Sequence, residues 1–376
     1  MKNSLFIPLV SIGVCGLAAT LSYFLTFLFI QLSRQFDLLD YPAGRKNHKK
    51  PTPFLGGLSI FISFWVVVFG GLVAASFVST TVTHQILKFS PKLAGIFAGS
   101  AIILIVGLLD DKFRWSPLRK LAGQVLAAGI LMSLGLTINL IESLGFLGYV
   151  GTFLWIILII NAFNFIDSLD GHCTGIALIS SIMFFWMTQI MEQQMLALFL
   201  ITFSGALIGF LPHNFKPAKI FLGDNGSHFI GYMMAAFTLL CRYQAPHSSF
   251  AVLFIPVLIF GVPIYDMMSV IIVRLSRGMA PWQGDRNHFA HRLVKIGMSE
   301  KVAVIFSYLV AFTIGHVAVL TTQVDLFGVI LIGIIFLSII GVIAFLEFYA
   351  AQRIRISDEL AKRLHRRRED IQRRES

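Results

Sequence analysis

Two adjacent aspartates, Asp110 and Asp111, end an apolar stretch and are followed by four basic residues within nine positions, in LLDDKFRWSPLRK. Neighbouring carboxylates repel each other unless a cation lies close to them. A solvated helix end, with the Lys and Arg residues as counter-ions, explains this pattern. A base or metal site beside cations that hold phosphate explains it equally well. This segment by itself leaves both interpretations open.

Four polar residues recur every third position in NAFNFIDSLDG, namely Asn161, Asn164, Asp167 and Asp170. On a helix this spacing predicts one polar stripe. Amides and carboxylates at the end of a membrane span are costly when they face lipid, so we expect the stripe to face a helix bundle or a polar cavity. Gly171 is suited to end the helix. An ordinary polar cap explains one of the four residues but not their regular spacing, which favours a functional site.

The segment FLGDNGS places Asp224 between Gly223 and Gly226, three residues after the aromatic Phe221. Flanking glycines allow a ligand to approach the backbone closely. A carboxylate suits Mg²⁺ with bound phosphates, and an aromatic ring can stack on a base. Alone, this segment is a plain turn as often as it is a site.

A fourth cluster, GDRNHFAHR, holds Asp285, Arg286, His288, His291 and Arg292. Cations at this density, on the same side as the Asp and Asn residues, favour a bound polyanion. The i, i+3 spacing of the two histidines is also compatible with zinc, but the H-E-x-x-H pattern is absent. A solvated basic loop is the remaining interpretation.

Two further features stand outside these clusters. The first basic loop, DYPAGRKNHKKPTPFLGG, contains Lys46, and either topology or binding explains its charge. Asp266 lies inside an apolar stretch, and a carboxylate there is a candidate for function or for helix packing.

The composition indicates that the segments carrying these residues lie in a membrane protein. Of the 376 residues, 56% are hydrophobic and 13% charged, whereas a soluble domain carries about 25% charged residues. The three cysteines are far apart, which indicates neither a disulfide framework nor a thiolate metal site. We therefore expect an all-α polytopic membrane protein with a single transmembrane domain over 1–350 and a basic tail over 351–376. About 11 apolar stretches approach the spanning length of ~20 residues: 5–31, 55–78, 93–109, 121–138, 149–166, 173–190, 195–213, 227–241, 250–273, 302–322 and 326–350.

The basic residues predict the orientation. All of the 30 Lys and Arg residues except Lys2, Lys88, Lys92 and Arg242 fall in one alternating set of connections and the C-terminal tail. The positive-inside rule places that set in the cytosol, with the N-terminus outside and the C-terminus inside. All four polar clusters then face the cytosol. The net charge of +11 is mostly a topology signal, and attraction to anionic membrane lipids explains it better than nucleic acid does.

In their order and spacing, LLDDKF, NAFNFIDSLDG, FLGDNGS and DRNHFAHR resemble the polyprenyl-phosphate N-acetylhexosamine-1-phosphate transferases of glycosyltransferase family 4, over residues 37 to 293. The chain is most similar to the GlcNAc-1-phosphate branch, which starts O-antigen, enterobacterial common antigen or teichoic acid linkage synthesis. The muramyl-pentapeptide branch, the alternative within the family, usually shows three successive histidines in the last loop, where this chain has Phe289 and Ala290 after His288.

The resemblance implies an activity. A UDP-N-acetylhexosamine, by default UDP-GlcNAc, donates its sugar-1-phosphate to undecaprenyl phosphate, and UMP is released, at the bacterial inner membrane with the site facing the cytosol. It implies Mg²⁺ as cofactor, with Mn²⁺ as a substitute. A homodimer is left open.

The resemblance also implies roles for residues. Asp224 and Asn164 match the Mg²⁺-holding pair, Asp170 and Phe221 the uracil contacts, and Asp110 and Asp111 the aspartates near the lipid phosphate. The resulting candidates are Asp110, Asp111, Asp167 and Lys120 as catalytic residues, Asp224 and Asn164 as metal ligands, and Asn161, Asp170, Phe221, Arg286, His288, His291 and Lys46 as substrate-binding residues.

A membrane transporter is the main alternative from another class, and the intramembrane Asp266 would fit one. Transporters, however, place their polar groups near the membrane midplane. Here these groups cluster at one face, and the sequence shows no inverted repeat. The sequence therefore favours an enzyme.

Overall fold

The structure is a computed structural model that describes residues 6–42, 50–77, 80–138, 144–243, 251–285, 287–324 and 327–345. Three features predicted from the sequence lie outside these residues: Lys46, Arg286 and the tail 351–376.

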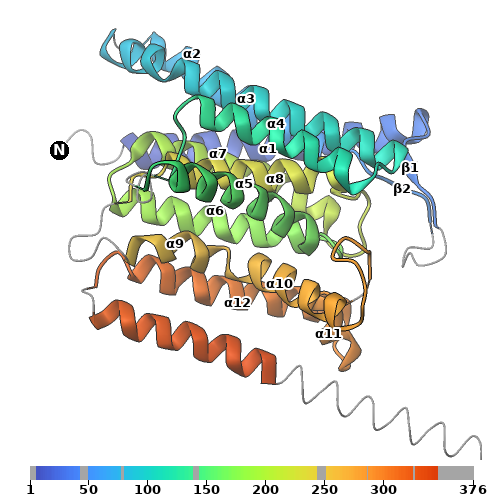
Figure 1. Cartoon of the computed structure of the whole chain (residues 1–376). Helices are drawn as coiled ribbons and strands as arrows, with labels where there is room; N and C mark the ends of the chain where they lie inside the picture. The colour runs from blue at the N-terminus through green and yellow to red at the C-terminus, as the bar shows by residue number, and fades with distance from the viewer. Residues whose placement is uncertain are drawn as a thin grey trace, which may run out of the picture.

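The described chain is a bundle of helices with one short hairpin (Figure 1), which confirms the all-α expectation. Strand β1 (Leu39–Asp40) pairs antiparallel with β2 (Thr52–Pro53). A further helix covers Phe327–Phe345. The helices are α1 (Phe6–Gln35), α2 (Gly56–Ser76), α3 (Thr80–Phe113), α4 (Pro117–Ser133), α5 (Phe146–Ile166), α6 (His172–Ile190), α7 (Gln194–Asn214), α8 (Gly223–Leu240), α9 (Ala251–Ile259), α10 (Gly261–Ser276), α11 (Phe289–Lys295) and α12 (Glu300–Leu320).

Within the described residues, 8 helices are long and apolar enough to cross a membrane. This result supports a multi-pass membrane protein but does not confirm the count of eleven. Three of the expected spans account for the difference. Helix α4 has only 17 residues and α8 begins with a polar turn, while the stretch 250–273 is divided at Phe260 into α9 and α10. The orientation stays a prediction.

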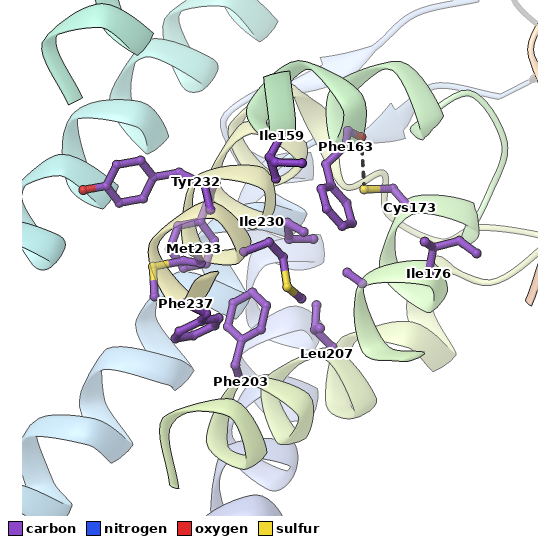
Figure 2. Packing of buried hydrophobic residues seen from close by; sticks show 14 of the residues in the cluster. Ile159, Phe163, Cys173, Ile176, Phe203, Leu207, Ile230, Tyr232, Met233 and Phe237 are labelled. Atoms are coloured by element: carbon purple, nitrogen blue, oxygen red, sulfur yellow. Dashed lines mark hydrogen bonds between the residues drawn. The ribbon is translucent and has the colours of Figure 1, made fainter. Parts of the chain in front are cut away.

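Helix α8 forms the centre of the bundle. Every residue from Asn225 to Leu239 is buried, and the helix packs against α2, α3 and α5. Figure 2 shows Phe203, Ile230 and Phe237 among the side chains packed there. An apolar lipid provides little hydrophobic drive between helices, so close packing contributes much of their association.

Glycines bring two neighbouring helices close to the start of α8. A Cβ on Gly107 of α3 would lie 2.4 Å from the backbone nitrogen of Asn225, and one on Gly57 of α2 would lie 2.3 Å from the backbone nitrogen of Gly226. Both contacts are shorter than side chains tolerate. The close approach of α2 and α3 to α8 therefore requires glycine at these positions.

Backbone hydrogen bonds join the hairpin and α2 to the segment before α8. The Phe221 N–H donates to the Pro53 carbonyl (2.8 Å), and the Gly56 and Gly57 N–H groups donate to the Phe221 and Leu222 carbonyls (3.2 and 3.0 Å). The hairpin and α11 lie at the same end of the bundle, opposite the N-terminal end of α1 (Figure 1). This packing gathers the polar segments of the sequence at one end.

Candidate active site

A cavity of about 1100 Å³ opens at this end of the bundle. Its wall combines residues from the β1–β2 hairpin, the α3–α4 and α5–α6 connections, the segment before α8 and the segment between α10 and α12. Eight of the candidates predicted from the sequence line it: Asp110, Asp111, Lys120, Asp167, Asp170, Phe221, Asp224 and His291.

Lys120 stands between two carboxylates in the cavity wall. Its Nζ lies 2.7 Å from Asp110 Oδ2 and 2.8 Å from Asp224 Oδ2. The lysine comes from the first turn of α4, where Pro117 opens the helix with a φ angle already suited to it. Residues about 100 positions apart therefore form one network of opposite charges.

Asn164 reaches the same carboxylate from α5. Its Nδ2 donates to Asp224 Oδ1 (2.9 Å) and to Ser227 Oγ (3.0 Å). The two residues predicted to hold the metal are therefore in contact. In this arrangement the Asn164 amide orients Asp224, because its nitrogen rather than its oxygen faces the carboxylate.

Asp111 is bound to the start of α8. Its Oδ1 accepts from the Asp224 N–H (2.9 Å), and its Oδ2 accepts from the Asn225 N–H (3.1 Å) and the Asn225 side-chain amide (2.7 Å). A carboxylate at a helix N-terminus satisfies backbone donors that lack a partner within the helix. Asp111 thus orients Asp224, whereas Asp110 faces Lys120.

Only glycine fits the position before Asp224. Gly223 has a φ of +74°, and a Cβ there would lie 2.8 Å from Asp111 Oδ2 and 2.6 Å from the Phe54 carbonyl oxygen. The glycine of the G-D-N-G segment is therefore required by backbone geometry and by the close contact with Asp111.

The polar stripe of α5 continues into the cavity. Burial raises the pKa of Asp167 well above the ordinary carboxyl value, and the charges of Asp224, Asp111 and Asp170 raise it further. Asp170 accepts a hydrogen bond from the Ala218 N–H (3.1 Å), and it lines the same cavity as Phe221. The two residues expected to recognise uracil therefore line the same cavity.

The donor set suits a divalent cation that also binds phosphate. Among the described residues, no group of three His, Cys, Asp or Glu side chains is placed to hold a metal by itself. Mg²⁺ in phosphate-transfer sites, however, commonly takes one or two carboxylates together with substrate phosphates and waters. Asp110, Asp167 and Asp224 line one cavity. Burial raises the pKa of Asp167, and the charges of the neighbouring carboxylates add to that rise.

The segment 277–299 connects α10 to α12, includes α11 and is called the last loop below. It contributes His291 and Asp285 to the cavity wall. Asp285 pairs with Arg274 of α10, whose Nη2 lies 3.0 Å from Asp285 Oδ1. Burial would raise the pKa of Asp285, but the hydrogen bonds from Arg274 and Asn287 outweigh it and hold that pKa below its ordinary value. His288 is buried behind the wall, where its Nδ1 lies 2.8 Å from Asp266 Oδ2.

Asn161 is placed apart from the polar cavity. It lines an apolar groove of about 530 Å³ together with Trp155, Leu158 and Met267. Its Nδ2 donates to Gln124 Oε1 (2.8 Å). The polar stripe therefore connects two environments, an apolar groove at Asn161 and the charged cavity at Asp167 and Asp170.

Several residues of the cavity wall were not among the catalytic, metal-binding or substrate-binding candidates: Asp40, Lys50, Arg114, Trp115, Lys216, Asp285 and Glu300. Arg114 and Trp115 stand within LLDDKFRWSPLRK, and Asp285 stands within the fourth cluster, so their motifs were signals for them. Lys216 forms an ion pair with Glu300 at the start of α12. No pattern in the sequence relates these two residues.

Comparison with known proteins gives the same assignment as the motifs. The family described as Glycosyl transferase family 4 matches residues 93–242. A probable undecaprenyl-phosphate N-acetylglucosaminyl 1-phosphate transferase of Bacillus subtilis is 33% identical over 83% of this chain and 86% of its own length. A decaprenyl-phosphate N-acetylglucosaminephosphotransferase of Mycobacterium tuberculosis is 31% identical, with 81% and 80% covered. An undecaprenyl-phosphate alpha-N-acetylglucosaminyl 1-phosphate transferase of Thermotoga maritima is 29% identical, with 79% and 87% covered.

Helices of membrane-spanning length and a cavity lined by carboxylates and cations at one end of the bundle fit a membrane-bound enzyme that handles phosphate groups. The chain belongs to glycosyltransferase family 4, in the branch of the polyprenyl-phosphate N-acetylglucosamine-1-phosphate transferases. The resemblance inferred from the motifs is confirmed.

Proposed function

We propose that the protein transfers GlcNAc-1-phosphate from UDP-GlcNAc to a polyprenyl phosphate and releases UMP. The observation that carries the proposal is the cavity in which Lys120, Asp110 and Asp224 meet beside Asp170 and Phe221. The cavity offers a cation and carboxylates for a diphosphate and its metal, and an aromatic ring and a further carboxylate for a base. The names of the relatives support the same activity.

In this reaction an oxygen of the acceptor phosphate attacks the phosphorus that carries the sugar. A new P–O–P link forms, the bond to the UMP phosphate breaks, and UMP leaves with the electron pair. A phosphate monoester has a second pKa of about 6, so the acceptor is largely a dianion at neutral pH and needs no strong base. Asp110 would position the nucleophile or take up its remaining proton. Lys120 would neutralise charge that builds on the diphosphate.

We propose Mg²⁺ as the metal, with Asp224 as its main ligand, Asp110 or Asp167 at its side and Asn164 orienting Asp224. When bound, Mg²⁺ would supply positive charge to the diphosphate oxygens. The protein residues would align the two phosphate groups and keep Asp224 in place through Asn164 and Asp111.

The apolar groove at Asn161 supports a lipid acceptor. It is lined by aliphatic and aromatic side chains of α5 together with Met267 of α10, and Asn161 and Gln124 are hydrogen-bonded to each other at its polar end. We propose that an isoprenoid chain, undecaprenyl in the default case, enters here while its phosphate turns toward the cavity. We also propose that the cavity faces the cytosol at the bacterial inner membrane, and that the product begins an envelope polysaccharide such as O-antigen.

The purified protein in detergent should release UMP from UDP-GlcNAc when undecaprenyl phosphate and Mg²⁺ are both present, and should form a lipid-linked GlcNAc diphosphate. Both products are measured together, and EDTA should stop both. No UMP from any of several UDP-N-acetylhexosamines would contradict the proposal and favour a transporter.

An aspartyl-phosphate intermediate is the rival route. Asp111 is poorly placed for it, because both of its oxygens accept hydrogen bonds from the start of α8. Rapid quenching of the protein with labelled UDP-GlcNAc and no lipid should leave the protein unlabelled. Phosphorylated protein would contradict direct transfer.

A further inference from the structure

A carboxylate inside α10 binds the last loop from behind. Asp266 is fully buried, and its Oδ2 lies 2.8 Å from His288 Nδ1. Its other oxygen, Oδ1, accepts a hydrogen bond from the Phe289 N–H at the start of α11. A buried carboxylate is stable only when its oxygens are satisfied, and here both are satisfied by the same loop.

This contact determines how the His288 ring is oriented. An ionised carboxylate only accepts hydrogen bonds, so the hydrogen between the two residues belongs to His288 Nδ1. Nε2 is then on the side of the ring away from Asp266. The ring lies beside Phe165 of α5 and His291, with centroid distances of 6.0 Å and 6.2 Å.

Two further side chains of α10 hold the same loop. Ser269 Oγ accepts from Arg292 Nη2 (2.8 Å). Arg274 is buried, donates to Asp285 Oδ1 (3.0 Å) and to the Pro281 carbonyl, and lies over the Phe165 ring at 5.1 Å. Helix α10 therefore contacts the loop at three places, namely Asp285, His288 and Arg292. The same loop carries Asp285 and His291, which line the cavity.

We propose that Asp266 is a positioning residue for donor recognition: by binding His288 and the first turn of α11, it sets where His291 stands in the cavity wall. This role rests on the proposed function, because the donor is taken to be a UDP-sugar whose diphosphate and sugar meet that wall. Asp266 is not among the residues that line the cavity. Its effect passes through His288 and the backbone of Phe289.

The substitution Asp266→Asn tests the role with little change in shape. Its amide oxygen can still accept from the Phe289 N–H, while its NH₂ group turns toward His288 Nδ1. The charge-assisted hydrogen bond from Nδ1 is therefore lost, and the contact persists only if the imidazole proton moves to Nε2, which reverses the role of Nε2. We expect KM for UDP-GlcNAc to rise about tenfold or more, the effect of one charge-assisted hydrogen bond. KM for undecaprenyl phosphate should stay within about twofold and the melting temperature close to that of the wild type, because the apolar groove and the bundle core are unchanged.

Asp37→Asn is the matched control. It makes the same chemical change in an exposed carboxylate that accepts a hydrogen bond from Tyr41. Neither of these two residues lines the cavity, so both KM values should stay at the wild-type level. An unchanged donor KM in Asp266→Asn would overturn the positioning role. So would an equal loss for donor and acceptor with a lower melting temperature, which is the result expected of a merely structural carboxylate.

Variants of His288 provide an independent readout. His288→Asn places an amide nitrogen near the position of Nδ1 and retains the Asp266 contact, whereas His288→Gln places its amide near Nε2 and loses that contact. Adding Asp266→Asn to His288→Gln should leave the donor KM at the level of His288→Gln alone. Adding Asp266→Asn to His288→Asn should raise the donor KM above that of His288→Asn alone. Additive effects in both pairs would overturn the coupling. If the wild-type protein releases no UMP in the same assay, the proposed function itself fails, and this role fails with it.

Discussion

Lys120 gives the cavity its central positive charge. Its ammonium group bridges Asp110 and Asp224, two of the carboxylates proposed to lie at the metal. A lysine between two carboxylates neutralises part of their repulsion when no diphosphate is present. We propose that on substrate binding the same cation contacts the diphosphate oxygens.

The substitution Asp224→Asn should abolish turnover. An amide keeps the size of the side chain but removes the charge that binds Lys120 and the proposed Mg²⁺. UMP release with UDP-GlcNAc and undecaprenyl phosphate measures the effect, which should exceed about a hundredfold. Size-exclusion chromatography should show an intact protein, because α8 stays buried. Activity within about tenfold of the wild type would contradict the assigned role.

The raised pKa of Asp167 predicts that the stability of the protein depends on pH. Its pKa is raised by burial and by the charges of Asp224, Asp111 and Asp170, so the folded protein binds this proton more tightly than the unfolded chain does. Stability of the metal-free protein should then fall as pH rises above about 4, the ordinary carboxyl pKa. Asp167→Asn should melt at a higher temperature than the wild type at pH 8 in EDTA, and at an equal temperature near the acid limit.

Added Mg²⁺ should reduce the difference in melting temperature between Asp167→Asn and the wild type at pH 8, because a divalent cation offsets the repulsion among the carboxylates. A variant that melts below the wild type at pH 8 would show that Asp167 is needed as an ionised partner.

At the scale of elements, the junction of α3 with α8 separates the roles of the two adjacent aspartates. Asp111 accepts three hydrogen bonds from the first residues of α8, whereas Asp110 pairs with Lys120. Gly107 allows α3 to approach α8 closely enough for these contacts.

Asp111→Asn should therefore lower both stability and turnover, while Asp110→Asn should lower turnover alone. At position 111 an Asn side chain keeps one acceptor oxygen but turns its NH₂ group toward N–H donors of α8. Such an unsatisfied buried contact costs about 1–3 kcal/mol. Thermal unfolding in detergent, measured on both variants, checks the difference. Equal melting temperatures would show that the contact with α8 is dispensable.

At the scale of the whole molecule, the polar segments meet at one end of the bundle although they are spread from residue 40 to residue 300. The concentration of Lys and Arg in one set of connections predicts that this end faces the cytosol. Fluorescent protein fused after Ser376 should fluoresce in cells. Alkaline phosphatase fused after Arg242 should be active, because that connection is predicted to lie outside. The reverse result at either position would contradict the orientation.

Much of the site was predictable because its residues lie in short, ordered motifs. Asp110, Asp167, Asp170, Phe221 and Asp224 were selected from their local patterns, and all of them line the cavity. The count of eleven spans was less secure. Hydropathy does not reveal that the stretch 250–273 is divided at Phe260, nor that α4 is only 17 residues long.

The sequence by itself determined the membrane class, the all-α architecture and the family, because hydropathy and short motifs are local properties. Only the tertiary structure decided which polar residues meet. It separated Asp110 from Asp111, placed Asn161 in an apolar groove and bound His288 to Asp266. These outcomes depend on contacts between helices far apart in the chain, set by the close packing of α8 against its neighbours, and no spacing within one motif encodes them.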